Sequence, residues 1–242
     1  MDHPKSSDSP SVLGQPSALI NIITKNQNLE TFREQHWKGA FEDYLSLVHQ
    51  NPRVTRTAFQ RIYDMILSAG STEYFDSRKK IIHYHFFDDA AHGGRDAVFG
   101  LDIPLMKMVN IFKSAAQRYG TEKRVLLLHG PVGSAKSTIV RVLKKGVEEY
   151  SKTPEGAVYT YSWIPELDNP QDTFPCPMHE EPLHLVPAEF REALLARLND
   201  GRAEDEWIQI EGDLCPACRQ HYKELNLRYD SAQTTHVDVD TL

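Results

Sequence analysis

One short stretch of the chain has the residue types and spacing of a phosphate-binding loop. It runs from Gly130 to Thr138 with the sequence GPVGSAKST, close to the pattern Gly-x-x-x-x-Gly-Lys-Ser/Thr. Glycines in such a loop let successive backbone amides converge on phosphate oxygens. Lys136 would add positive charge at the β and γ phosphates, and the hydroxyl of Ser137 can bind Mg²⁺. The stretch therefore predicts binding of a nucleoside triphosphate, with ATP and Mg²⁺ as the expected ligands.

Ala135 is the one departure from this pattern, because glycine is usual at its position. Alanine is tolerated there at negative φ but costs more than about 1 kcal/mol at positive φ. The context favours a phosphate loop over a chance glycine-rich turn. An apolar run, Val125 to Leu128, precedes the loop, and a helix with an apolar face follows it.

The three cysteines fall in two short turns that suggest a metal site. Two residues separate Cys176 from His179, and two separate Cys215 from Cys218. This spacing lets each pair reach one metal ion. Together they form a Cys₃His set suited to a structural, tetrahedral Zn²⁺. Two other interpretations stay open, namely free thiols or a redox pair. The histidines that could replace His179 are His184 and His221.

An acidic partner for the magnesium ion is not evident after the loop. The run WIQIEGD from Trp207 to Asp213 ends in Glu211 and Asp213. Gln209 interrupts its apolar pattern, so we do not assign it that role. Catalytic residues are therefore left unassigned.

Hydrophobic spacing indicates the elements that would position these residues. Helices are predicted over 29–49, 59–67, 106–116, 139–147, 187–198 and 217–229, with Gly70 capping the second. Strands are predicted over 125–128, 157–164 and 207–210, and 79–87 fits a strand or a buried loop. The order strand, loop, helix, strand over 125–164 predicts parallel strands and a right-handed crossover.

Composition and element order suggest three segments. Residues 1–27 read as a disordered lead-in, because the start of the chain is rich in Ser, Pro and Asp. A helical segment follows over 28–95, and an α/β nucleotide-binding core over 96–242. The core includes a proline-rich, irregular Cys/His insertion at about 165–230. The last residues, 231–242, are polar, and we expect them to be frayed.

Bulk properties exclude several functional classes. The net charge of −7 does not favour nucleic acid or an anionic membrane as a partner. No apolar run approaches the roughly 20 residues that a membrane helix needs, and the amino terminus lacks a secretory signal. Three cysteines are too few for a disulfide framework. A cytoplasmic protein is expected.

The chain resembles the amino-terminal part of the PrkA-type serine protein kinases, which carry an AAA+ domain. The similarity covers 41–229 and is most specific in FGLD at 99–102, LLLHGPVGSAKST at 126–138 and YTYSWIPE at 159–166. CPMHEEPLHLVP at 176–187 and GDLCPACRQHYKEL at 212–225 complete it. The resemblance implies a P-loop NTPase fold with a three-layer, parallel-sheet core.

The resemblance also implies a cytoplasmic protein that binds ATP, phosphorylates a protein substrate on serine and assembles into homo-oligomers. Family members are much longer, so this chain alone is expected to be inactive. An alternative is a non-catalytic module that senses nucleotide, is stapled by zinc and controls assembly. The implied nucleotide contacts are Gly130, Val132, Gly133, Ser134, Ala135, Lys136, Ser137 and Thr138.

Overall fold

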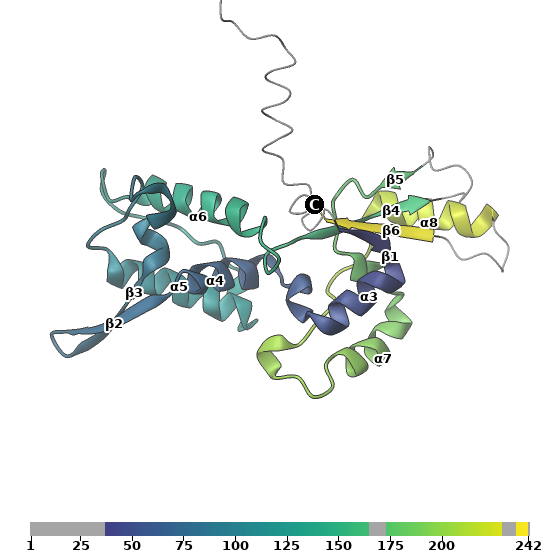
Figure 1. The fold of residues 1–242 in the computed structure, drawn as a ribbon, viewed down its shortest axis with the longest axis horizontal. Helices are drawn as coiled ribbons and strands as arrows, with labels where there is room; N and C mark the ends of the chain where they lie inside the picture. Colours follow the sequence, from purple (N-terminus) through teal and green to yellow (C-terminus); the bar gives the residue numbers. More distant parts are fainter. Residues whose placement is uncertain (1–36, 165–172, 229–235, 242) are drawn as a thin grey trace, which may run out of the picture.

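The computed structural model describes residues 37–164, 173–228 and 236–241, which form two lobes side by side (Figure 1). The first lobe contains α4 (Ala58–Ser68), β2 (Ser71–Asp76), β3 (Lys79–Tyr84), α5 (Asp102–Ala116) and α6 (Lys136–Tyr150). The second contains β1 (Lys38–Ala40), α3 (Phe41–Gln50), β4 (Tyr159–Ile164), β5 (Phe174–Pro175), α7 (Ala188–Leu198), α8 (Pro216–Arg228) and β6 (His236–Thr241). The short 3-10 helices are Pro52–Thr55, His85–Asp88, Ala90–His92, Thr121–Lys123, Pro182–Leu185 and Glu204–Glu206. Each lobe has its own apolar core.

Local sequence signals explain the first lobe. A capping box starts α4, in which the Thr57 amide donates to Gln60 Oε1 (3.0 Å) and the Gln60 amide donates to Thr57 Oγ1 (3.4 Å). The hairpin β2–β3 closes through Ser77 and Arg78, both at positive φ, as a two-residue hairpin turn requires. Gly70, at φ +84°, ends α4 as predicted.

The helix that follows the phosphate loop is fixed to the first lobe by packing and charge. Ile139 and Val142 of α6 are buried in the core that α4 and α5 also line. On a second side, the Asp96 carboxylate accepts hydrogen bonds from Arg141 Nε (3.0 Å) and Lys145 Nζ (2.5 Å). These charges lower the pKa of Asp96, the Lys145 hydrogen bond most of all. The start of α6 is thus held in place from two directions.

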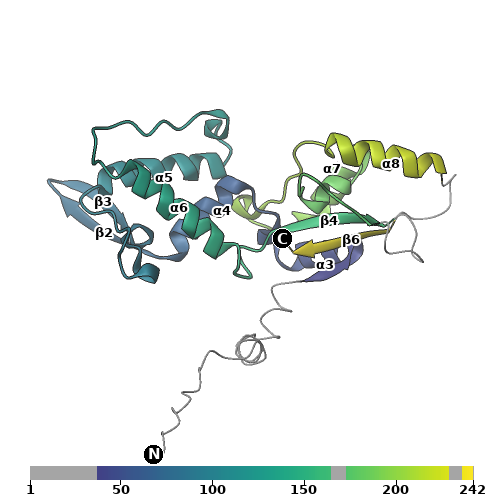
Figure 2. The ribbon, with the colours of Figure 1, turned by 90° about the horizontal axis from the view of Figure 1, so that it is seen from above.

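The second lobe is built on a four-stranded sheet with the order β1-β6-β4-β5. Every pair in it is antiparallel. Side chains at alternate positions of a strand share one face, and the three aromatic residues Tyr159, Tyr161 and Trp163 of β4 are all buried. Both views show the sheet apart from the helices of the first lobe (Figure 2).

A carboxyl group is partly buried beside this sheet. Tyr44 of α3 donates a hydrogen bond to Glu181 Oε1 (2.5 Å), and the amide of Leu183 donates to Glu181 Oε2 (2.9 Å). Burial disfavours the carboxylate and raises the pKa of Glu181 to about 7, although both hydrogen bonds act in the opposite direction. Glu181 therefore changes charge near neutral pH inside the fold.

The prediction of a buried parallel strand over 125–128 is wrong for the described residues. This segment has no regular structure, and the side chains of Val125 and Leu127 are 95% and 80% exposed. A doubly buried strand needs a neighbour at each edge. The edges of β4 are occupied by β5 and β6 instead. The three-layer, parallel-sheet core implied by the resemblance is accordingly not present in the part of the chain that the structure describes.

Three other element predictions need correction. Of the helix predicted over 29–49, residues 29–36 lie outside the described residues, and residues 38–40 are not helical because they pair with β6 as strand β1, so that α3 begins at Phe41. Residues 207–210 are irregular, with Ile208 buried and Trp207 half-exposed. The polar end of the chain is not wholly frayed, since 236–241 form β6 inside the sheet.

The remaining helix predictions are confirmed as α4, α5, α6, α7 and α8, and the strand over 157–164 is confirmed as β4. The predicted lead-in, 1–27, lies outside the described residues, as do 165–172 of the predicted insertion. The helical segment expected over 28–95 contributes to both cores, α3 to one and α4 to the other. Among the described helices, none has the length and apolarity to cross a membrane.

Candidate functional site: a phosphate loop and a buried thiol cluster

The predicted phosphate loop forms a tight turn on the surface ahead of α6. Gly133 has φ +83°, and a Cβ at Gly130 would lie 2.8 Å from Ser134 Oγ. Gly133 therefore needs glycine for its backbone angle, whereas a side chain at Gly130 would displace the Ser134 hydroxyl. The Ser134 hydroxyl donates to the Pro131 carbonyl (2.8 Å) and closes the turn.

Lys136 lies at the mouth of this turn. Its ammonium group donates to the carbonyl oxygens of Gly130 (2.9 Å) and Pro131 (2.6 Å) and to Ser134 Oγ (2.9 Å). The side chain thus folds back over the loop that precedes it. The positive charge stands where an incoming polyphosphate would meet the loop, and phosphate oxygens can replace the carbonyls as its partners.

The first turn of α6 supplies backbone donors. Its first helical hydrogen bond runs from the Ile139 amide to the Ala135 carbonyl (2.8 Å). The amides of residues 136–138 precede that bond and have no acceptor within the helix. The positive end of the helix dipole is also directed at this point. Ser137 is exposed there, so its hydroxyl can reach a magnesium ion, and Val132 is fully exposed at the tip.

Ala135 has the strained conformation that the sequence analysis weighed. Its φ of +54° and ψ of +12° place it in the left-handed region, at the amino-terminal cap of α6. An alanine there costs on the order of 1 kcal/mol relative to glycine. Ala135 therefore adopts the backbone conformation that favours glycine at this position of the loop, although it carries a Cβ.

Ala135→Gly is expected to raise the free energy of unfolding by up to about 1 kcal/mol, because it removes this strain. Denaturant unfolding measures it. Gly133→Ala is the matched control, since its φ is also positive and a Cβ there would meet no atom within 4 Å. That variant should lose about 1 kcal/mol. A lower free energy of unfolding in both variants would contradict the left-handed conformation of Ala135.

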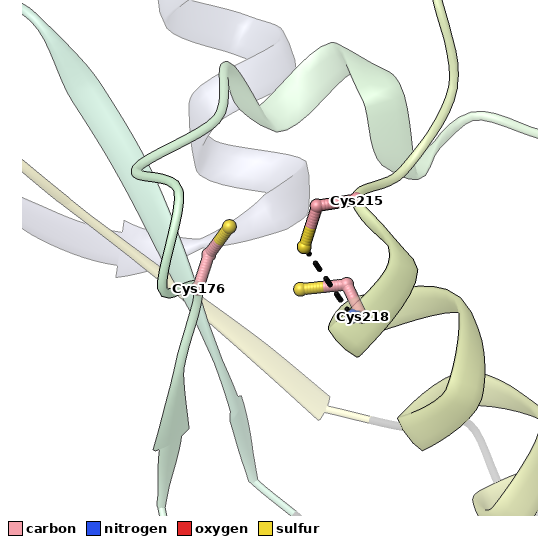
Figure 3. Close-up of side chains that lie close together, drawn as sticks. All are labelled: Cys176, Cys215 and Cys218. Carbon is pink, nitrogen blue, oxygen red and sulfur yellow. Dashed lines mark hydrogen bonds between the residues drawn. The ribbon is translucent and has the colours of Figure 1, made fainter.

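The second candidate site is a cluster of three thiols in the other lobe. The sulfur atoms of Cys176, Cys215 and Cys218 lie within 4.8 Å of one another, and all three residues are buried and unbridged. Figure 3 shows them pointing toward one another from the turn after β5 and from the start of α8. The structure therefore brings the two predicted cysteine turns together.

Hydrogen-bond donors surround the sulfurs. Cys215 Sγ accepts from the Cys218 amide (3.4 Å), and Cys218 Sγ accepts from Trp163 Nε1 (3.4 Å). Cys176 Sγ accepts from the Glu180 amide (3.5 Å). Burial raises the pKa of the Cys218 thiol to about 12, despite the donors that stabilise its charged form.

The predicted histidines are not part of this cluster. His179 is exposed at φ +49°, and its ring is not part of the sulfur group. His184 Nε2 bonds the Glu211 carbonyl (2.8 Å). The ring of His221 stacks on Phe174 at 4.8 Å between centroids. The sequence analysis missed Trp163 and its neighbours, although the alternating aromatics of 159–163 are a signal for one buried face.

The rejected magnesium partners have other contacts. Glu211 forms an ion pair with Arg118 (2.5 Å), and Asp213 lies 3.6 Å from Arg191. Gln209, the residue that interrupts the run, also accepts a hydrogen bond from Arg118. Each of the two carboxylates therefore has an arginine partner in the absence of a nucleotide.

A turn rich in glycine, a lysine at its mouth and a helix whose free amides follow it define a P-loop nucleotide-binding domain. The comparisons agree, because the profile of the PrkA AAA domain matches residues 39–240. The chain belongs to the PrkA AAA domain family.

Two curated proteins are similar to the chain. "ATP-dependent protease PrkA" of Bacillus subtilis (strain 168) is 39% identical over 202 residues, which are 81% of this chain. "Uncharacterized protein in gldA 5'region" of Geobacillus stearothermophilus is 32% identical over 108 residues, which are 44% of this chain and 98% of that protein. No solved structure matches. The chain spans 27% of the length of the Bacillus protein.

Proposed function

We propose that this chain is the ATP-binding AAA module of a PrkA-like protein. In this proposal the loop from Gly130 to Thr138 positions Mg-ATP for phosphoryl transfer, either to a protein serine or to water. Transfer to serine is what the resemblance to the kinases implies. Transfer to water accords with the name of the Bacillus relative, which is that of an ATP-dependent protease.

The single observation that carries the proposal is the position of the Lys136 ammonium. Two loop carbonyls and the Ser134 hydroxyl hold it beside the free amides that begin α6. A polyphosphate placed there would receive backbone N–H groups, the helix dipole and a full positive charge together. Ser137 would ligate the magnesium ion that bridges the β and γ oxygens.

This geometry predicts that binding affinity depends steeply on the number of phosphates in the nucleotide. Because the loop addresses β and γ phosphates, Mg-ATP and Mg-ADP should bind at least tenfold more tightly than AMP, about 1.4 kcal/mol in binding free energy. Isothermal titration of the purified chain with the three nucleotides measures it. Equal affinity for AMP and ATP would show that the base or ribose, rather than the loop, governs binding.

A second function, a non-catalytic and nucleotide-sensing assembly module, is favoured by the contacts of Glu211 and Asp213. Both carboxylates are engaged by arginines, and we propose no catalytic acid among the described residues. A zinc ion on the buried thiols would staple this module, and nucleotide state would control self-association. Phosphate release from ATP by the same samples would favour the enzyme, whereas self-association that changes with nucleotide state and without turnover would favour the module.

A further inference from the structure

The buried thiol cluster has the composition and the spacing of a metal centre. We propose that Cys176, Cys215 and Cys218 bind one Zn²⁺ ion as thiolates, with His179 as the fourth ligand. Tetrahedral coordination at a Zn–S distance of about 2.3 Å places sulfurs about 3.8 Å apart. The sulfurs already lie within 4.8 Å of one another, so shifts on the order of 1 Å would complete the site. Nucleotide binding is not required for this site.

The hydrogen bonds around the sulfurs are those that thiolates need. Two backbone amides and the Trp163 indole donate to the three sulfurs, one to each. The Tyr161 hydroxyl donates instead to Glu180 Oε2 (3.4 Å), and the Glu180 amide is the donor to Cys176 Sγ. Neutral thiols are weak acceptors that a protein core accommodates without such donors. A shell of donors orients metal-bound thiolates and offsets their negative charge.

The cluster is less well explained by a redox pair. A disulfide between Cys215 and Cys218 would use two sulfurs and leave Cys176, equally buried, at the same centre without a role. One metal ion uses all three. Three thiolates and an imidazole in a closed, buried position are the ligand set of structural zinc.

We assign the fourth ligand by comparing the contacts of the three histidines and their positions relative to the cysteines. His184 bonds the Glu211 carbonyl through Nε2 and keeps a buried Nδ1 without a hydrogen-bond partner, so it is the competing candidate, and His221 stacks on Phe174. His179 is exposed and belongs to the turn that carries Cys176, where its amide donates to the Cys176 carbonyl (3.1 Å). Because His179 and Cys176 share one turn with two residues between them, the pair has the spacing at which both side chains can bind one ion.

Bound zinc would tie together two segments that are distant in sequence. Cys176 follows β5, while Cys215 and Cys218 lie at the start of α8. Between them, the Cys176 amide donates to the Tyr161 carbonyl of β4 (3.0 Å). The metal would thus fasten α8 to the edge of the sheet, and its binding energy would add to the stability of this lobe.

Metal analysis of the nucleotide-free chain, purified under reducing conditions without chelator, tests the proposal. About one equivalent of zinc is expected. Competition with a chromophoric chelator should show at least a hundredfold loss of affinity in Cys176→Ser, Cys215→Ser and Cys218→Ser. Trp163→Phe, which removes the donor to Cys218 Sγ but no ligand, should keep one equivalent with affinity reduced by about tenfold.

Histidine variants test the fourth ligand in the same assay. His179→Ala should weaken zinc binding at least tenfold, whereas His184→Ala should not; the reverse would overturn the assignment of His179. Should the serine variants fail to fold, Co²⁺ added to the metal-free parent chain gives a separate readout. Thiolate-to-cobalt charge transfer and strong visible bands of tetrahedral cobalt would support the site. A folded chain that binds neither metal would overturn the whole proposal, and the ATP titration would be unaffected.

Discussion

Replacing Lys136 by alanine is expected to weaken Mg-ATP binding at least tenfold, about 1.4 kcal/mol. Lys136 is the only charged residue from Gly130 to Thr138. Its ammonium group bonds Gly130, Pro131 and Ser134, and the variant removes it. A charge-assisted hydrogen bond to phosphate is about twice as strong as a neutral one, so the remaining amides cannot compensate. Calorimetric titration of both proteins measures the difference.

Lys144→Ala is the matched control for this variant. Lys144 lies on the same helix and is exposed, so its loss changes the net charge equally without touching the loop. Its affinity for Mg-ATP should stay within about twofold of the parent, because exposed charges at this distance are screened. Equal affinity in all three proteins would remove Lys136 from the site.

Glu181→Gln is expected to flatten the pH dependence of stability. The folded protein holds a proton on Glu181 up to a pKa of about 7, whereas the unfolded chain releases it near 4.5. Between these values the folded state binds the extra proton, so stability falls as pH rises. At 1.4 kcal/mol per pKa unit the loss is on the order of 3 kcal/mol. Glutamine stays neutral; its Oε1 can accept from the Leu183 amide, and its Nε2 can donate to the Tyr44 hydroxyl.

Denaturant unfolding of both proteins from pH 4.5 to pH 7.5 measures this effect. The parent should lose stability relative to Glu181→Gln as pH rises through the window, and the difference should level off above the folded pKa. The exposed Glu189 of α7 offers a control, since Glu189→Gln should run parallel to the parent. Parallel curves for Glu181→Gln as well would show that the carboxylate is solvated, not buried.

Much of the site could be predicted from residue spacing. The glycines, the lysine and the helix after them fix the phosphate loop locally, because each requirement concerns adjacent residues. The two cysteine turns were also local signals. Their convergence at one point, which depends on the long-range pairing of β4 and β5, was a hypothesis that the structure supports. The donor Trp163 could have been found from its alternation with Tyr159 and Tyr161 on one strand.

The sheet could not be predicted to the same extent, since strand pairing depends on residues far apart in sequence. The run from Val125 to Leu128 has the pattern of a buried strand, yet no neighbour for it lies among the described residues. Strand β1 is short and polar, and β6 is a polar segment at the end of the chain. Strand β1 is too short to show a pattern, whereas Val237 to Asp240 of β6 alternate apolar and polar residues, which is a strand signal that the polar composition of the segment obscured.

In the proposed mode of nucleotide binding, backbone amides at the start of α6 donate hydrogen bonds to the polyphosphate. Amide chemical shifts of isotopically labelled chain, recorded as Mg-ADP is added, test this most directly. We predict that the largest shifts belong to residues 130–138 and saturate with the calorimetric affinity. Saturable binding that leaves these amides unchanged and moves others instead would contradict the assignment of the loop.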